Sequence, residues 1–151
     1  MILSGFLEEI SNMRIECILG GATGGISWGA WLSDRLDLPF GYVRSSSKGY
    51  GKKQSIEGDI DVSDNILIIE DVVSTGGSIG RAINLLKESS ANSLNALSIF
   101  SYQFPESVEM FQKLNVPFQS LLTCLLYTSD AADDLLCVDL GGRRIIKKKK
   151  I

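Results

Sequence analysis

The chain has 151 residues, 44% of them hydrophobic and 22% charged, and its formal net charge is −3. This length predicts one domain with enough apolar residues for a core, and the acidic balance argues against nucleic-acid binding. The sequence has no histidine, which excludes a Ser-His-Asp triad and any histidine metal site. The three cysteines lack paired or metal-like spacing, and no stretch resembles a membrane span or a signal peptide, so we expect a cytoplasmic location.

The first third of the chain predicts alternating helices and strands. Residues 1–13 have the spacing of an amphipathic helix. An apolar run at 15–19 predicts a strand, a second helix is expected over 26–36, and residues 40–43 predict the next strand. The apolar face of the first helix consists of Ile2, Phe6, Leu7 and Ile10.

A glycine-rich turn, Gly20-Gly21-Ala22-Thr23-Gly24-Gly25, separates the first strand from the second helix. Backbone N–H groups in such turns can form a concave anion-binding site. Glycine turns are also common without any ligand, so this turn by itself leaves both interpretations open. A second loop of similar character, further along the chain, favours the anion-binding interpretation.

Residues 44–55 differ from the segments before them, because they are polar and basic and show no hydrophobic period. One interpretation is a solvated surface loop with scattered charge. The other is a lid, in which Arg44, Lys48 and one of Lys52 or Lys53 close over a polyanion and exclude water.

The centre of the sequence is Ile66-Leu67-Ile68-Ile69-Glu70-Asp71-Val72-Val73-Ser74-Thr75-Gly76-Gly77-Ser78. Its four branched apolar residues predict a strand buried on both faces, as in a parallel sheet. Two adjacent carboxylates follow, then a loop rich in hydroxyls and glycine. A helix is expected over 79–88, because its apolar residues recur at helical spacing.

This order of strand, acid pair, small-residue loop and helix suits a phosphorylated sugar. Free N–H groups at a helix start favour a phosphate, whereas Glu70 and Asp71 suit sugar hydroxyls or a magnesium ion. The alternative is an ordinary strand-to-helix turn with capping Ser and Thr residues. No Gly-Lys-Ser/Thr follows, so the loop is not a Walker motif, and it lacks dinucleotide-fingerprint spacing.

The remaining elements complete an α/β pattern. A strand is expected over 94–102, a helix over 105–114 with Pro105 in its first turn, and an edge strand over 116–122. Alternating strands and helices predict a parallel sheet with helices on both faces. The ligand should then lie at the carboxyl ends of the strands, where all three loops fall.

The central stretch resembles the phosphoribosyl diphosphate signature of type I phosphoribosyltransferases, and its E-D-x-x-S-T-G-G-S form resembles the orotate phosphoribosyltransferases in particular. The resemblance implies the type I phosphoribosyltransferase fold. It also implies that the two acids hold the ribose 2- and 3-hydroxyls and that the loop binds the 5-phosphate. The substrate-binding residues implied here are Glu70, Asp71, Val72, Val73, Ser74, Thr75, Gly76, Gly77 and Ser78.

Two further motifs extend the resemblance. G-G-A-T-G-G-I resembles the family's diphosphate loop, which implies substrate contacts at Ala22, Thr23 and Gly24. Y-V-R-S-S-S-K-G-Y-G-K-K-Q-S-I-E-G resembles the catalytic loop, in which Arg44 and Lys48 are the implied catalytic residues. The family's lysine commonly reaches the neighbouring subunit of a homodimer.

The third motif departs from the family at one position. Tyr50 stands in the substrate-contacting loop where the family usually has a histidine. A tyrosine can donate a hydrogen bond but is not a cation near neutral pH. If that histidine helps to neutralise the leaving diphosphate, this chain should be slower.

The resemblance implies transfer of 5-phosphoribosyl from 5-phospho-α-D-ribose 1-diphosphate (PRPP) to orotate, giving orotidine 5-monophosphate and diphosphate in pyrimidine (UMP) biosynthesis. The implied cofactor is Mg²⁺, carried by the diphosphate substrate without dedicated protein ligands and with Glu70 and Asp71 as candidate contacts. One alternative is a phosphoribosyltransferase for another base, such as a purine, against which the Ile56-Glu57-Gly58 end of the loop argues. The other is a non-catalytic PRPP-binding regulator.

The two ends of the chain predict a partial domain. The family has an N-terminal hood segment before the helix that begins here, and a closing helix after residue 123, so we expect residues 1–123 to be a partial phosphoribosyltransferase core. The segment 124–151 resembles the translation of a sequencing-library adapter, and we expect a non-native tail. A frayed basic C-terminus is the alternative. If this segment derives from an adapter, Lys147 to Lys150 are no evidence for nucleic-acid or membrane binding.

Overall fold

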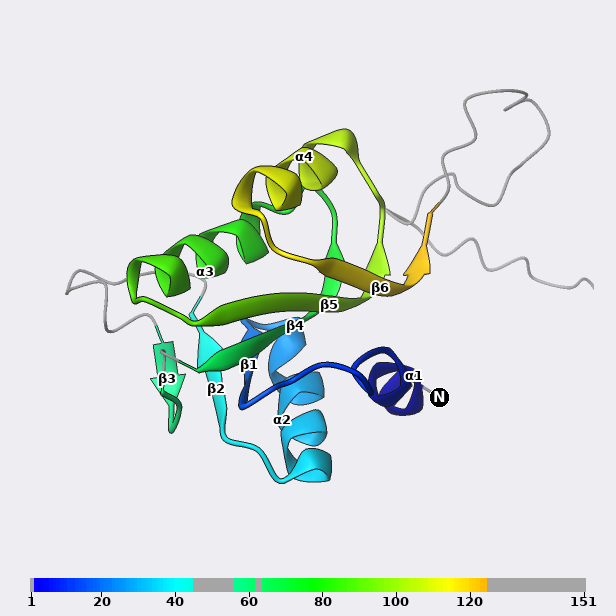
Figure 1. The fold of residues 1–151 in the computed structure, drawn as a ribbon. Helices are drawn as coiled ribbons and strands as arrows, with labels where there is room; N and C mark the ends of the chain where they lie inside the picture. The colour runs from blue at the N-terminus through cyan, green and yellow to red at the C-terminus, as the bar shows by residue number, and fades with distance from the viewer. Residues whose placement is uncertain (1, 45–55, 62–63, 125–151) are drawn as a thin grey trace, which may run out of the picture.

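Strands and helices alternate along the computed structural model, which describes residues 2–44, 56–61 and 64–124. Figure 1 shows a single sheet with helices on both of its faces. The described strands are β1 (Cys17–Gly21), β2 (Phe40–Val43), β3 (Ile56–Gly58), β4 (Asn65–Val73), β5 (Ser93–Ser101) and β6 (Phe118–Thr123). The described helices are α1 (Ile2–Glu9), α2 (Gly24–Leu36), α3 (Gly77–Glu88) and α4 (Pro105–Leu114).

The sheet has the strand order β3-β2-β1-β4-β5-β6. Every neighbouring pair is parallel except β2 and β3, which are antiparallel. The five parallel strands therefore end at one edge, as expected for a sheet whose connections carry helices. This architecture confirms the predicted α/β fold with a parallel sheet flanked by helices.

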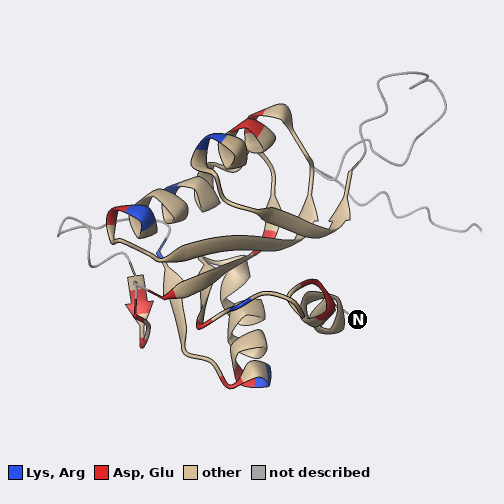
Figure 2. Ribbon diagram, viewed as in Figure 1, with Lys and Arg blue, Asp and Glu red and all other residues tan. Residues whose placement is uncertain are grey.

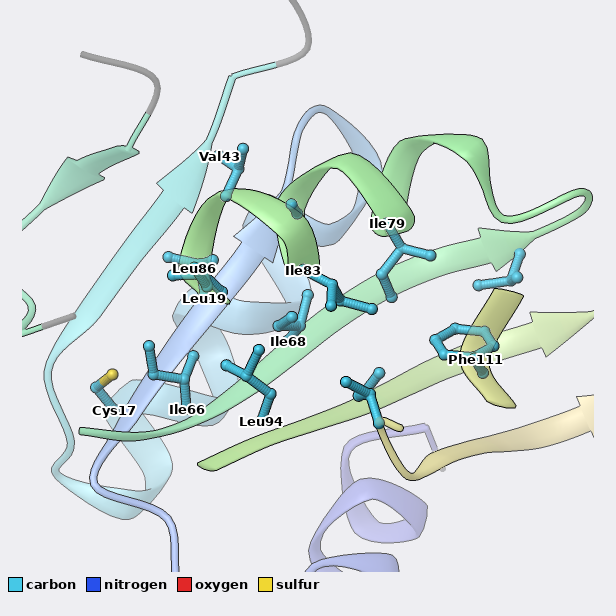
Figure 3. Close-up of a cluster of buried hydrophobic side chains, with 14 residues drawn as sticks. Cys17, Leu19, Val43, Ile66, Ile68, Ile79, Ile83, Leu86, Leu94 and Phe111 are labelled. Atoms are coloured by element: carbon cyan, nitrogen blue, oxygen red, sulfur yellow. The ribbon is translucent and has the colours of Figure 1, made fainter. Parts of the chain in front are cut away.

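The two faces of the sheet hold separate cores. On β4, Ile66 and Ile68 pack into one core and Leu67 and Ile69 into the other, following the period of two along a strand. Figure 3 shows the first core, in which Ile68 lies under Ile83 of α3. The second core lies against α1 and α2 and includes Phe6, Ile18, Leu32 and Leu97. A strand buried on both faces explains the continuous apolar run.

Several boundaries differ from the predicted ones, and those of β1, β5 and β6 are displaced by one or two residues. β4 continues to Val73, so the acid pair lies within the strand, because the ladder to β5 extends to the pair Val73 and Ser101. α1 ends at Glu9 in a turn closed by the Met13 N–H and the Ile10 carbonyl. α2 begins at Gly24 and α3 at Gly77, two residues earlier than expected in each case.

The strand β3 was not predicted as a separate element. It has three residues, and its pairing with β2 places Ile56 opposite Val43 and Glu57 opposite Tyr42. Three residues show no measurable period, so only the partner strand identifies them as a strand.

The charged side chains are dispersed over the described surface. Figure 2 shows Lys and Arg on α2, α3 and α4 with Asp and Glu beside them. Among residues 2–44, 56–61 and 64–124, no helix combines the length and apolarity that a membrane span needs.

Candidate functional site

The candidate site lies at the edge where the parallel strands end. The loop after β4 leads into α3, and the loop after β1 leads into α2. β1 and β4 are neighbours in the sheet, so the two glycine-rich loops predicted from the sequence lie side by side (Figure 1).

The loop after β4 encloses a hollow of about 110 Å³. α3 begins directly after Gly76, which has φ +82°, and no side chain caps the helix. The first N–H groups of a helix have no partner within it, so they can donate to an anion in this hollow. The hollow is lined by Glu70, Val72, Val73, Ser74, Thr75, Gly76, Gly77, Ser78 and Ile79.

The two acids lie between this hollow and the loop after β1. A Cβ atom at Gly21 would stand 2.1 Å from Oε1 of Glu70, and one at Gly24 would stand 2.0 Å from Oδ2 of Asp71. Both positions therefore need glycine for the carboxylates to keep their places. The structure thus brings together the acid pair and both loops, which the sequence predicted as one site.

The acids differ in their surroundings. Glu70 is 6% exposed, and its burial, with a smaller contribution from Asp71, raises its pKa from 4.5 to about 7. A hydrogen bond with the Ser78 side chain acts in the opposite direction. Asp71 is half-exposed, and its Oδ1 accepts the N–H of Val72 at 2.8 Å. Hydroxyl donors from a ligand would favour the ionised form of Glu70.

The loop after β1 is attached to the next strand. The Ala22 N–H donates to the Val43 carbonyl at 3.1 Å, and the peptide bond between Ala22 and Thr23 is cis. Thr23 is exposed, and Arg44 follows Val43 directly. The predicted diphosphate loop and the predicted catalytic arginine therefore begin at adjacent points of this edge.

Arg44 has a defined partner on β3. Its Nη1 donates to Oε1 of Glu57 at 2.9 Å, and the Tyr42 hydroxyl donates to Oε2 of the same carboxylate. Lys48 and Tyr50 lie outside the described residues, so their roles stay predictions.

A strip of apolar side chains lies beside the acids. Val72 is 47% exposed and pairs with Phe100 across the sheet. The Phe100 ring meets Tyr102 edge-on at 5.0 Å between centroids, and Tyr102 stacks on Phe104 at 5.3 Å. These aromatic residues were not predicted as part of the site, because Tyr102 and Phe104 follow the end of β5 and meet Phe100 only in the folded chain.

A larger hollow, of about 460 Å³, lies between α4 and β6 and is lined by apolar residues such as Phe111 and Phe118 and by polar residues such as Ser107 and Gln112. It contains none of the residues predicted for the site. Size alone is therefore a poor guide here, and the acids and the uncapped helix start identify the site.

The donor set fits a magnesium ion carried by a ligand. Among residues 2–44, 56–61 and 64–124, no three His, Cys, Asp or Glu side chains gather as a metal site. Glu70 and Asp71 provide two adjacent carboxylates, and Mg²⁺ commonly binds one or two carboxylates together with substrate phosphates and water.

The fold and the site define an α/β protein in which an acid pair and an uncapped helix start lie at the carboxyl edge of a parallel sheet. The sequence model described as "Phosphoribosyl transferase domain" matches residues 3–106. The chain belongs to this phosphoribosyltransferase family. The predicted resemblance to a type I phosphoribosyltransferase is thereby confirmed.

Several relatives of this chain are orotate phosphoribosyltransferases. The one from Staphylococcus epidermidis is 42% identical over 114 residues, covering 76% of this chain and 55% of the relative. The one from Halalkalibacterium halodurans is 38% identical over 143 residues, covering 89% of this chain and 68% of the relative. The crystal structure of the orotate phosphoribosyltransferase from Aeropyrum pernix superposes with a TM-score of 0.67 and 30% identity, covering 81% of this chain and 68% of that one. The chain spans little more than half the length of the first of these relatives.

Proposed function

We propose that this protein transfers 5-phosphoribosyl from PRPP to orotate, giving orotidine 5-monophosphate and diphosphate. The relatives of that name, at about 40% identity, support the choice of orotate. The observation that carries the proposal is the position of Glu70 and Asp71 at the end of β4, one short loop before the uncapped start of α3 and its hollow. This arrangement offers donors to a phosphate and acceptors to sugar hydroxyls within one loop.

Each part of PRPP has a matching group in the proposed site. The 5-phosphate lies in the hollow and accepts N–H groups of the loop and the first turn of α3. The ribose hydroxyls donate to Glu70 and Asp71. The diphosphate lies at Ala22, Thr23 and Gly24, with Arg44 at the end of the neighbouring strand.

The reaction needs charge stabilisation more than it needs a nucleophile. Breaking the bond from the ribose C1 to oxygen leaves positive charge on the sugar and negative charge on the departing diphosphate. Arg44 and Lys48 stabilise the negative charge, and the two acids fix the sugar on the side where positive charge grows. A magnesium ion bound to the diphosphate would neutralise part of its charge, with Glu70 and Asp71 as the nearest protein carboxylates.

The proposed base position is the strip of Val72, Phe100, Tyr102 and Phe104. A base joined to C1 must lie beside the ribose acids, and Val72 follows Asp71 in the strand. Flat apolar side chains suit the ring of a planar base. Orotate carries a carboxylate as well, for which the described strip provides no cation.

The wider proposal includes a homodimer and a cytoplasmic location. In the family the catalytic-loop lysine commonly enters the neighbouring subunit, and Lys48 holds that position in the sequence. Pyrimidine biosynthesis is the pathway that consumes the product, orotidine 5-monophosphate.

The test is turnover with a panel of bases. Purified protein, PRPP and Mg²⁺ are incubated with orotate, uracil, adenine, guanine or hypoxanthine, and diphosphate release is measured. We expect release with orotate alone. Release with a purine would assign another base specificity, and tight PRPP binding without release for any base would indicate a regulator.

A further inference from the structure

The antiparallel pair β2 and β3 places three polar side chains on one face of a ribbon. Tyr42 and Glu57 are register partners, and Arg44 lies two residues beyond Tyr42. Side chains two residues apart on a strand share a face. The sequence separation between Tyr42 and Glu57 is 15 residues, so only the strand pairing brings them together.

Glu57 is held from two sides. Its Oε2 accepts the Tyr42 hydroxyl, and its Oε1 accepts Nη1 of Arg44 at 2.9 Å. The Tyr42 hydrogen bond, followed by that of Arg44, holds the pKa of Glu57 below its ordinary value. The carboxylate is therefore ionised at neutral pH and has two fixed donors, which restrict its rotamers.

This arrangement also restricts Arg44. The side chain of Arg44 is 47% exposed, and an exposed arginine without a partner would sample many rotamers. The bond to Glu57 uses one of the five guanidinium N–H donors. The others have no acceptor among the described residues, so they can donate to an anion bound at the loop after β1, whose Ala22 N–H is bonded to the residue before Arg44.

We propose that Glu57 is a positioning residue, which with Tyr42 holds the Arg44 guanidinium at the end of β2 ready for the diphosphate of PRPP. This inference rests on the proposed function, because it takes the diphosphate to bind beside Ala22. An Arg44 side chain that is already oriented before the ligand binds loses less conformational entropy on binding. Glu57 acts through Arg44 and does not touch the ligand.

The experiment compares two probes by calorimetry on the 151-residue chain in the presence of Mg²⁺. PRPP has the diphosphate, whereas ribose 5-phosphate has only the part that binds to the acids and the phosphate loop. We expect Glu57→Ala to weaken PRPP binding about ten-fold, a typical effect of losing a charged hydrogen bond, and to leave ribose 5-phosphate binding unchanged. Glu57→Gln keeps an acceptor oxygen and should lose less of the affinity for PRPP than Glu57→Ala. Tyr42→Phe should also lose part of the affinity for PRPP.

A double variant separates positioning from folding. In an Arg44→Ala background, Glu57→Ala should weaken PRPP binding no further. Equal losses for both probes, or a full additional loss in the Arg44→Ala background, would overturn the positioning role. Glu109→Ala, which removes the exposed Glu109–Lys113 pair on α4, is the matched control and should bind both probes like the unaltered chain.

The outcomes also distinguish this inference from the proposed function. If the unaltered chain binds neither PRPP nor ribose 5-phosphate, the proposed function fails and the positioning role fails with it. If the chain binds both probes and Arg44→Ala weakens PRPP alone, the proposed function stands. A Glu57→Ala variant that then binds PRPP like the unaltered chain overturns only the positioning role.

Discussion

Glu70 shows how burial changes the chemistry of a single residue in the site. A carboxyl whose pKa is raised from 4.5 to about 7 binds a proton more tightly in the folded chain than in the unfolded chain. Stability from this group is therefore present below pH 4.5 and is lost as the pH rises through 7.

The first prediction concerns stability. Between pH 4.5 and pH 7.5, the free energy of unfolding should fall by about 3 kcal/mol through Glu70 alone. Urea denaturation at a series of pH values measures this slope. Glu70→Gln, which cannot ionise, should remove this component, and an equal slope in that variant would assign it to other groups.

The second prediction concerns ligand binding by the same residue. Sugar hydroxyls donate to the ionised form of Glu70, so below pH 7 the affinity for PRPP should rise with pH by up to about ten-fold per unit. Calorimetry from pH 5.5 to pH 8 tests this. PRPP itself titrates in this range, and Glu70→Gln shows the contribution of the ligand alone. Identical profiles for both proteins would remove Glu70 from ribose binding.

The third prediction concerns Lys48. A lysine that stabilises the departing diphosphate acts most strongly in the transition state. We expect Lys48→Ala to abolish turnover and to leave PRPP binding mostly intact. Lys113→Ala, on the exposed surface of α4, is the control. Unchanged turnover in Lys48→Ala would exclude Lys48 from the mechanism.

Among the elements, β4 carries both the core and the site. Its first half buries Ile66, Leu67, Ile68 and Ile69 on two faces, and its second half carries the acids. A rigid central strand therefore fixes the acids relative to the loops at its end.

The fourth prediction tests this dependence on the core. Ile68 is fully buried, and Ile68→Ala should lower the free energy of unfolding by about 2–5 kcal/mol. Leu122 on the edge strand β6 is 60% exposed. Leu122→Ala should therefore change the free energy of unfolding by less than about 1 kcal/mol. Chemical denaturation of the two variants should separate them clearly, and similar losses would contradict the described core.

The elements also show what the sequence could and could not predict. β2 and α4 have their predicted bounds, because each is a periodic or apolar run between clear turn signals. β3 was missed because its identity depends on the partner strand. In the site, the acids and the loop Ser74 to Ser78 were predicted because they are contiguous. The Tyr42–Glu57–Arg44 contacts and the Phe100–Tyr102–Phe104 strip depend on strand register, which the sequence does not state.

For the whole molecule, the boundary near residue 124 is a further proposal. The N–H of Cys124 donates to the Ser101 carbonyl at 2.9 Å, and this bond continues the β5–β6 ladder. We propose that the segment after it is not part of the domain.

The fifth prediction follows from that boundary. A chain ending at Cys124 should have a Tm within about 2 °C of that of the 151-residue chain, because a segment outside the domain adds no buried contacts. Differential scanning calorimetry of the two chains tests this. A Tm lower by more than about 5 °C would show that the segment belongs to the fold.

An orotate phosphoribosyltransferase site, as proposed for this chain, must convert PRPP and orotate into two products. The most direct test incubates the protein with PRPP, Mg²⁺ and orotate and measures orotidine 5-monophosphate and diphosphate together by chromatography. We expect that both products form in equal amounts, that Glu70→Gln and Lys48→Ala each reduce the rate, and that adenine does not replace orotate. Product formation with adenine alone, or PRPP binding with no product for any base, would contradict the proposed function.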